Sequence, residues 1–504
     1  MSTPGDTPQG PAKPDGPEEV LTGKALDRKV IQNSGWTALI YGSRSMVLML
    51  STLVLVRLLQ PHEFGITAVA MMLIGVAQQL QAAGMTAAII YKRENIREAA
   101  ASAILFTGTG GFLLAGVAAV IAPYFTHIIG APEATDVVRV MAILLALRGL
   151  AAVPGAILER SLDYGSRAKA DIGSILVQFA VAIGTAAVGF GVWSLVAGSL
   201  AGTLTQTITY WVLIPWRPNP REGNLKTLRE LIRYGRFITI NNLALLFSNT
   251  AQTAAVTRIL GTTALGYYNV TFRLANLPTT LVGVAVGRSM FPAYSMVQNN
   301  LAEFRRIFLQ MLQRTALLVV PLAVLLAIGA EPIVRALLGE KWLPVIWPLR
   351  IVAAFSVIRA FGASAGAVFQ AAGKPHLAAW YALPQAITIV PLLIVLTKWL
   401  GVSGAALGML LSFAVSGMPA FVQALRLLEI TPRMLTRSLT PSLACSGILA
   451  VVLLALVPTS LEIPPLAGFA VVAVGAAVTY AIAAVTIARS AVRPIWRSLR
   501  GSPA

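Results

Sequence analysis

The sequence is poor in charge, in cysteine and in histidine. Only 12% of its 504 residues are Asp, Glu, Lys or Arg, against roughly 25% in a soluble globular protein. Hydrophobic residues make up 56%, and the mean hydropathy is +0.75. So little charge excludes a soluble enzyme, a disordered chain and a nucleic-acid binder. The single cysteine, Cys445, excludes an internal disulfide and is expected to be a packing residue, and the three scattered histidines show no metal-ligand spacing.

Long apolar runs predict an all-α integral membrane protein with about fourteen transmembrane helices, each near the 20 or so residues that cross a bilayer. Residues 1–30 are expected to form a disordered cytoplasmic tail, and 490–504 a second cytoplasmic tail. The expected spans are 34–58, 64–90, 100–122, 136–158, 171–190, 193–214, 237–260, 266–290, 314–338, 344–372, 375–398, 402–428, 440–458 and 464–489.

The basic residues alternate with these spans. Of the 39 Lys and Arg, 28 fall in the two tails and in every second loop, whereas the other loops contain only Lys341 and Lys398. Lys and Arg gather in cytoplasmic loops, so both termini are predicted to be cytoplasmic in a multi-pass protein of the bacterial inner membrane. The opposite loops are short. This argues against a membrane glycan polymerase or ligase, which usually needs large outer loops bearing acids or histidines.

Three segments recur in the same order, about 200 to 211 residues apart. Residues 57–65 resemble 258–266, residues 139–156 resemble 350–367, and 191–198 resemble 401–408. The chain is therefore expected to contain two parallel six-helix repeats, with the substrate between the two lobes near the middle of the membrane. The predicted units are an N-lobe at 31–215, a basic linker at 216–236, a C-lobe at 237–430, and two extra C-terminal helices at 431–489.

Nine arginines fall inside the predicted spans. Five lie near outer ends, where they can snorkel to the interface: Arg57, Arg139, Arg258, Arg335 and Arg350. A role in gating or in a substrate path is expected for Arg57, Arg139, Arg258 and Arg350. Four lie deeper, namely Arg44, Arg148, Arg273 and Arg359. Each deep arginine costs about 2.5–3.5 kcal/mol if it faces lipid. No Asp or Glu stands clearly mid-span to neutralise them, so they predict a hydrated, cationic cavity for an anionic substrate.

Asparagines share helical stripes with these positions. In span 8, Asn269 and Asn276 lie on one face with Arg273, and in span 7 Asn242 and Asn249 form a similar stripe. Amides suit sugar hydroxyls or polar headgroups, and they serve equally well in helix–helix hydrogen bonds. The stripe with Arg273 favours substrate binding for Asn269 and Asn276. The sequence has no nucleotide-binding loop, nucleophile elbow, metal cluster or close acid pair, so we expect no catalytic residue, metal or cofactor.

Several stretches together resemble a known family. These are Arg57-Leu-Leu-Gln-Pro-His-Glu-Phe-Gly65, Leu158-Glu-Arg-Ser-Leu-Asp-Tyr-Gly-Ser-Arg-Ala-Lys-Ala170, Gly191-Val-Trp-Ser-Leu-Val-Ala-Gly198 and Phe291-Pro-Ala-Tyr294. From residue 30 to about 490 the chain resembles the Wzx-type polysaccharide and O-antigen flippases, the lipopolysaccharide-biosynthesis members of the multidrug/oligosaccharidyl-lipid/polysaccharide exporter superfamily.

The resemblance implies a V-shaped, two-lobe flippase, not an enzyme. It would move an undecaprenyl-pyrophosphate-linked oligosaccharide across the inner membrane by alternating access, for exopolysaccharide, capsule or O-antigen biosynthesis. Its expected partners are the lipid-linked anionic oligosaccharide, membrane lipids, and polysaccharide polymerase and export machinery, and no nucleic acid. Two alternatives stay open: a drug or cation antiporter of the same superfamily, and a membrane glycan polymerase or ligase.

Overall fold

The computed structural model describes residues 47, 50–82, 84–92, 94–161, 164–282, 294, 297 and 300–487, and every regular element in that part of the chain is helical. The first helices are α2 (Pro61–Ala82), α3 (Met85–Tyr91), α4 (Ile96–Ile129), η1 (Pro132–Ala134), α5 (Thr135–Met141), α6 (Ile143–Arg160), α7 (Tyr164–Ala187) and α8 (Val192–Leu213). After a short turn, η2 (Pro220–Glu222), come α9 (Leu225–Val282), α11 (Leu301–Ile328), α12 (Ala330–Ile333), the π-helical turn η4 (Val334–Leu338), η5 (Glu340–Val345), α13 (Ile346–Ala371), α14 (Pro375–Leu427), α15 (Pro432–Leu461) and α16 (Pro465–Ile487).

These helices follow the predicted spans in order. Nine helical stretches among the described residues are long and apolar enough to cross a membrane. The longest, His376–Leu427, contains two predicted spans, and α9 likewise runs through two. The prediction of an all-α membrane protein with about fourteen spans is confirmed. The first predicted span, 34–58, and the last residues of spans 8 and 14 lie partly outside the described residues, as do both tails.

Glycines mark the turns where one span meets the next. Gly401 lies within α14 at φ 59°, ψ −137°, and Gly191 precedes α8 at φ 56°, ψ −132°. Side chains disfavour this backbone region, which glycine adopts readily. The two glycines belong to the repeated segments 191–198 and 401–408. Equivalent positions of the two repeats therefore share the same unusual backbone conformation.

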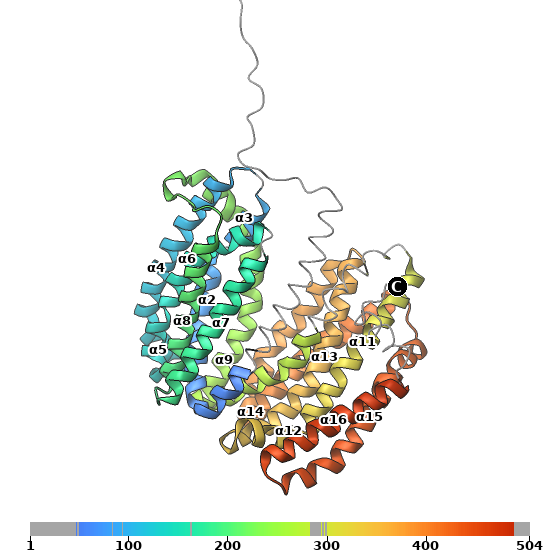
Figure 1. The fold of residues 1–504 in the computed structure, drawn as a ribbon. Coiled ribbons are helices and arrows are strands. Elements are labelled where there is room, and N and C mark those ends of the chain that lie inside the picture. The colour runs from blue at the N-terminus through green and yellow to red at the C-terminus, as the bar shows by residue number, and fades with distance from the viewer. Residues whose placement is uncertain are drawn as a thin grey trace, which may run out of the picture.

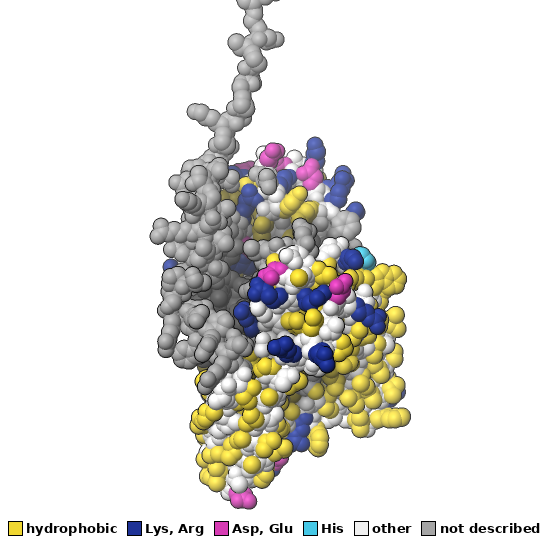
Figure 2. Space-filling view, turned by 90° about the vertical axis from the view of Figure 1, so that its right-hand side faces the viewer, with side chains coloured by type: hydrophobic (Ala, Val, Ile, Leu, Met, Phe, Trp, Pro, Cys, Tyr) yellow, Lys and Arg dark blue, Asp and Glu magenta, His cyan; other side chains and the backbone are white. Residues whose placement is uncertain are grey.

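The helices form two groups that together have the shape of a V (Figure 1). One group contains α2 to α8 with the first part of α9, and the other contains α11 to α16. The groups meet near the start of α2 and the turn within α14, and they separate toward the end that bears the loop after α8. We call the separated end the basic end, because it carries the loop basic residues, and the other the far end. Figure 2 shows Lys and Arg gathered toward the basic end above a mostly hydrophobic surface.

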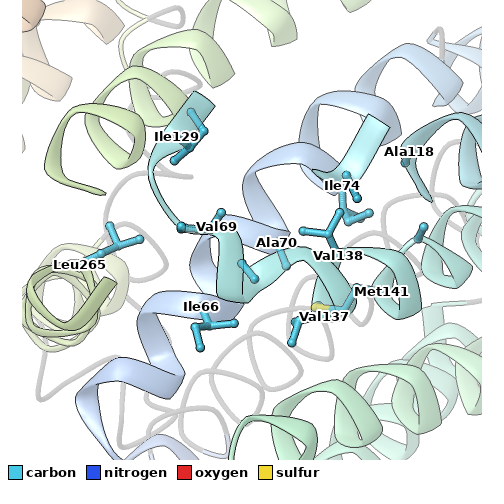
Figure 3. Packing of buried hydrophobic residues seen from close by; sticks show 14 of the residues in the cluster. Ile66, Val69, Ala70, Ile74, Ala118, Ile129, Val137, Val138, Met141 and Leu265 are labelled. Carbon is cyan, nitrogen blue, oxygen red and sulfur yellow. The ribbon is translucent and has the colours of Figure 1, made fainter. Parts of the chain in front are cut away.

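Helices from both halves share the same hydrophobic cores. Ile66 and Val69 of α2 cluster with Val138 of α5, and Leu265 of α9 joins them (Figure 3). In a second cluster, Val56 from the end of the first span packs with Trp342 of η5 and residues of α9 and α13. The far end is therefore held by interlocking helix contacts between the two halves.

The last two helices lie on the outside of the second group (Figure 1). Leu449 and Leu453 of α15 pack with Val472 and Ala476 of α16. Cys445 is buried beside Leu317 of α11 and Ala483 of α16, as expected of a packing residue. Many other apolar side chains of α15 and α16 are exposed, which is normal for helices whose solvent is lipid.

Candidate substrate site

Arg148 lies in the middle of the membrane-spanning segment Pro132–Arg160, on α6. Its side chain is half-buried, and Nη1 donates a hydrogen bond to the amide oxygen of Gln78 on α2. The partner is neutral, so the positive charge of Arg148 is not cancelled by a carboxylate among the described residues. A guanidinium that is solvated only in part keeps its attraction for an anion.

Arg273 lies in the part of α9 that follows the Gly261 kink, between the buried residues Thr271 and Leu274. The side chain is nevertheless exposed, and none of the described acids forms an ion pair with it. Asn269, one turn earlier, is half-buried and donates to the backbone oxygen of Leu265 at 3.1 Å. The amide of Asn269 is thus partly used within its own helix, as in the packing alternative, while Arg273 remains open to a ligand.

Arg359 is the repeat counterpart of Arg148, and it is half-buried on α13 within the segment Glu340–Ala371. The three described deep arginines therefore lie on α6, α9 and α13, with both halves represented. Arg44 lies outside the described residues. The side chains of Asn242, Asn249 and Asn276 do so too, although their backbone belongs to α9.

Arg57 and Arg258 lie at the far end, and each lies beside a segment of the other sequence repeat. Arg57 donates from Nε to the carbonyl oxygen of Leu337 at 3.0 Å and from Nη2 to that of Ala336. These carbonyls end the π-helical turn η4, where the helix dipole favours a cation. The Nη1 of Arg258 lies 3.2 Å from where a Cβ would stand on Gly130, the residue that follows α4. Both arginines thus lie beside the C-terminal end of a helix from the other repeat.

The other arginines near this end have local partners. Arg139 is exposed and pairs with Asp136 one turn away at 3.2 Å. Arg335 pairs with Glu331 on the preceding turn at 2.9 Å. Arg350 stacks its guanidinium over the ring of Trp347 at 4.8 Å, and its Nε is buried with no hydrogen-bond partner among the described residues.

A polar cluster toward the basic end of α7 was missed in the sequence. Its helix begins at Tyr164, not near residue 171 as predicted, so Asp171 lies inside the helix. Asp171 accepts hydrogen bonds from Tyr210 at 2.6 Å and from Gln206 at 2.8 Å on α8, and Arg167 pairs with Glu159. The i, i+4 spacing of Arg167 and Asp171 was the signal that the cluster existed. These acids are paired locally, and among the described residues neither forms an ion pair with Arg148 or Arg273.

Gln81 serves packing. It is buried and donates from Nε2 to the carbonyl oxygens of Thr107 at 3.0 Å and Leu145 at 2.8 Å, which joins α2 to α4 and α6. A Cβ on Gly111 or Gly149 would collide with this amide, so the two glycines make room for it. Two glutamines of α2 therefore differ in their contacts: Gln81 joins neighbouring helices, whereas Gln78 accepts a hydrogen bond from Arg148.

Residues 54–347 match the family model described as polysaccharide biosynthesis protein. The chain belongs to this family. It is 20% identical over 393 residues to the lipopolysaccharide biosynthesis protein WzxC of Escherichia coli, with 77% of this chain and 79% of that protein covered. It is 24% identical over 322 residues to the succinoglycan biosynthesis transport protein ExoT of Rhizobium meliloti, with 64% and 65% covered.

Among solved structures, the lipid II flippase MurJ in an inward closed conformation shares the fold, at a TM-score of 0.70 and 13% identity, over 92% of this chain and 100% of that one. A multidrug resistance transporter in an inward-facing conformation also shares it, at a TM-score of 0.63 and 16% identity, over 78% and 98%. The predicted superfamily fold is therefore confirmed.

Proposed function

We propose that this protein is a flippase that moves an undecaprenyl-pyrophosphate-linked oligosaccharide across the inner membrane by alternating access, for exopolysaccharide, capsule or O-antigen biosynthesis. The observation that carries the proposal is the state of Arg148 and Arg273. Both lie inside spanning helices, one bonded to a neutral amide and the other exposed. Family membership and the transport-related names of its relatives support the same reading.

The chemistry of the arginines selects the class of substrate. Guanidinium groups bind phosphate oxygens through two parallel hydrogen bonds, which a pyrophosphate can accept from more than one arginine. Placing these charges toward lipid would cost about 2.5–3.5 kcal/mol each on insertion scales, so retention of the charges is best explained by an anionic ligand. A cationic drug would meet repulsion at the same positions.

The V shape supports the direction of transport. We propose that the basic end faces the cytoplasm, because Lys and Arg gather in cytoplasmic loops, and that both termini are cytoplasmic. The groups separate at that end and meet at the far end (Figure 1), which corresponds to an inward-open state. Residues 31–215 and 237–430 would form the two lobes, except that the first part of α9 lies with the first group, with 216–236 as the linker and 431–489 as added helices. Closing one end while opening the other would expose the arginines to each side in turn.

The test uses a deletion strain complemented with the Arg148→Ala, Arg273→Ala and Arg359→Ala variants, and with Arg433→Ala as the control. Arg433 is exposed at the start of α15, away from these positions. Membrane insertion is checked for every variant, and the location of the lipid-linked oligosaccharide in the two leaflets is measured. We expect the deep variants to leave the oligosaccharide in the cytoplasmic leaflet, and Arg433→Ala to behave as wild type.

Each contrary outcome identifies a different function. Normal export in all three deep variants would refute the flippase. Drug sensitivity of the deletion strain with unchanged glycan would indicate an antiporter. Oligosaccharide that reaches the outer leaflet but stays unpolymerised would indicate a polymerase. A flippase of this kind is expected to act beside a separate polymerase and export machinery.

A further inference from the structure

A pocket of about 470 Å³ lies at the basic end, away from the deep arginines. The end of α3 and the loop after it form one wall, and the first turns of α9 form the other. Its lining residues are Ala88, Tyr91, Lys92, Glu94, Glu230, Leu231 and Tyr234. The proposed transport cycle assigns no role to this pocket.

Two tyrosines dominate the pocket. The rings of Tyr91 and Tyr234 are stacked with centroids 4.6 Å apart and planes 15° apart. Both rings remain accessible, since Tyr91 is 69% exposed and Tyr234 40%. Stacking fixes the two rings relative to each other, and together they form a rigid aromatic surface. The two side chains therefore lose little further conformational entropy when a ligand binds. A rigid surface of this kind binds a flat apolar face at low entropic cost.

The charge of the pocket differs from that of its surroundings. Lys92 and Glu230 form an ion pair at 3.2 Å that bridges the two walls, and Glu94 is exposed beside it. The described lining residues thus include two acids and one base, at an end of the molecule that is otherwise rich in Lys and Arg (Figure 2). The two carboxylates repel a phosphate group, and the three charged groups disfavour binding of an acyl chain. Carboxylates do accept hydrogen bonds from hydroxyl and amine groups.

We propose that this pocket binds sugar residues of the substrate. A pyranose ring presents a C–H face that packs on an aromatic ring and hydroxyls that donate to carboxylates, and the pocket supplies both partners. This inference rests on the proposed function, since the sugars belong to the lipid-linked oligosaccharide. The pocket would hold the glycan at the cytoplasmic mouth, while the arginines take the pyrophosphate deeper in the bilayer.

The experiment measures binding to purified full-length protein in nanodiscs, with two probes. One is the water-soluble oligosaccharide released by mild acid from the lipid-linked pool of the cell, and the other is inorganic pyrophosphate. The variants are Tyr91→Leu and Tyr234→Leu, which remove the ring, and Tyr91→Phe, which keeps it. The matched control is Tyr124→Leu on α4, where the tyrosine is 72% exposed.

Both Leu variants should bind the oligosaccharide roughly tenfold more weakly than wild type, as expected for loss of an aromatic contact. Tyr91→Phe and Tyr124→Leu should bind it as wild type does, and pyrophosphate binding should be unchanged throughout. Equal oligosaccharide affinity in wild type and both Leu variants would overturn the proposal, and so would failure of wild type to bind the oligosaccharide.

The proposed function fails separately, through normal export in the deep-arginine variants. A pocket that binds no sugar is compatible with a flippase, so the two failures are distinguishable.

Discussion

Gly65 and Gly266 occupy equivalent positions in the two repeats and face each other's helix at the far end. A Cβ on Gly65 would overlap the carbonyl oxygen of Thr262, and a Cβ on Gly266 would overlap that of Pro61. Pro61 and Thr262 are themselves repeat counterparts, four residues before each glycine. The contact is therefore reciprocal, as at a two-fold interface. It brings the backbones of α2 and α9 together where the two halves meet.

The first prediction concerns this crossing. Gly65→Ala and Gly266→Ala should each destabilise the protein by about 1–3 kcal/mol, because the added methyl meets rigid backbone and the helices must separate. Gly110→Ala on α4 is the matched control, since no atom lies within 4 Å of its added Cβ. Thermal unfolding in detergent measures the effect. Unchanged melting of the Gly65 and Gly266 variants would show that the helices are not in contact in the stable state.

A second prediction concerns Gln81. Gln81→Leu should lower the unfolding free energy by about 1–3 kcal/mol, because two buried carbonyl oxygens lose their donor. Gln79→Leu, on the same helix but only half-buried, is the control and should melt near wild type. Insertion and thermal stability are the measurements. If both variants melted alike, the bridge from Gln81 to α4 and α6 would not contribute to stability.

The sequence predicted the helical framework because apolar length and loop charge act locally along the chain. It also revealed the repeat that contains Gly65 and Gly266. It did not reveal that their backbones touch, since glycine shows only that space is needed. Nor did it give the partners of Arg57, which are carbonyl oxygens at Ala336 and Leu337. Every residue has such an oxygen, so no side-chain pattern marks it as an acceptor.

Acids were the other source of error. Asp171 seemed to stand at the start of a span because Arg167 and Lys169 interrupt the apolar run just before it. In the structure α7 begins earlier and the charged side chains pair with neighbours on α6 and α8. The hydropathy pattern therefore placed the start of α7 too late, because the charged side chains in its first turns pair with residues of neighbouring helices. The deep positions of Arg148, Arg273 and Arg359 were predicted from span boundaries alone, and their role in binding stays a prediction.

The third prediction concerns Arg57, whose side chain ties the end of the first span to η4. Hydrogen bonds from a charged group contribute about 1.5–3 kcal/mol, so Arg57→Ala should lower the free energy of unfolding by about that amount. Thermal unfolding in detergent measures the effect. Lys398→Ala removes an exposed cation near the same end and serves as the control. Equal melting of Arg57→Ala and wild type would show that these hydrogen bonds do not contribute to stability.

The two sides of the far end are bonded unequally. On one side Lys341 donates to the carbonyl oxygens of Arg57 at 2.9 Å and Leu59 at 2.7 Å, and Trp342 donates to that of Val56 at 3.0 Å. The corresponding turn of the first half, residues 130–134, contains neither lysine nor tryptophan. There the bridge is a hydrogen bond from Thr262 to Glu133 at 2.9 Å. At the far end, the end of the first span thus makes more hydrogen bonds to the second repeat than Thr262 of α9 makes to residues 130–134 of the first.

The last prediction follows from this inequality. When the far end opens, the weaker side should separate and the stronger side should move as one body. In a Cys445→Ala background, a short cross-linker between cysteines at Leu59 and Lys341 should leave export largely intact, whereas the same cross-linker between Glu133 and Thr262 should abolish it. Each cysteine pair without cross-linker is the control for loss of the native contacts. Loss of export in both cross-linked pairs would contradict the prediction. The two sides would then open together, and the hydrogen bonds of the stronger side would have to break in every transport cycle.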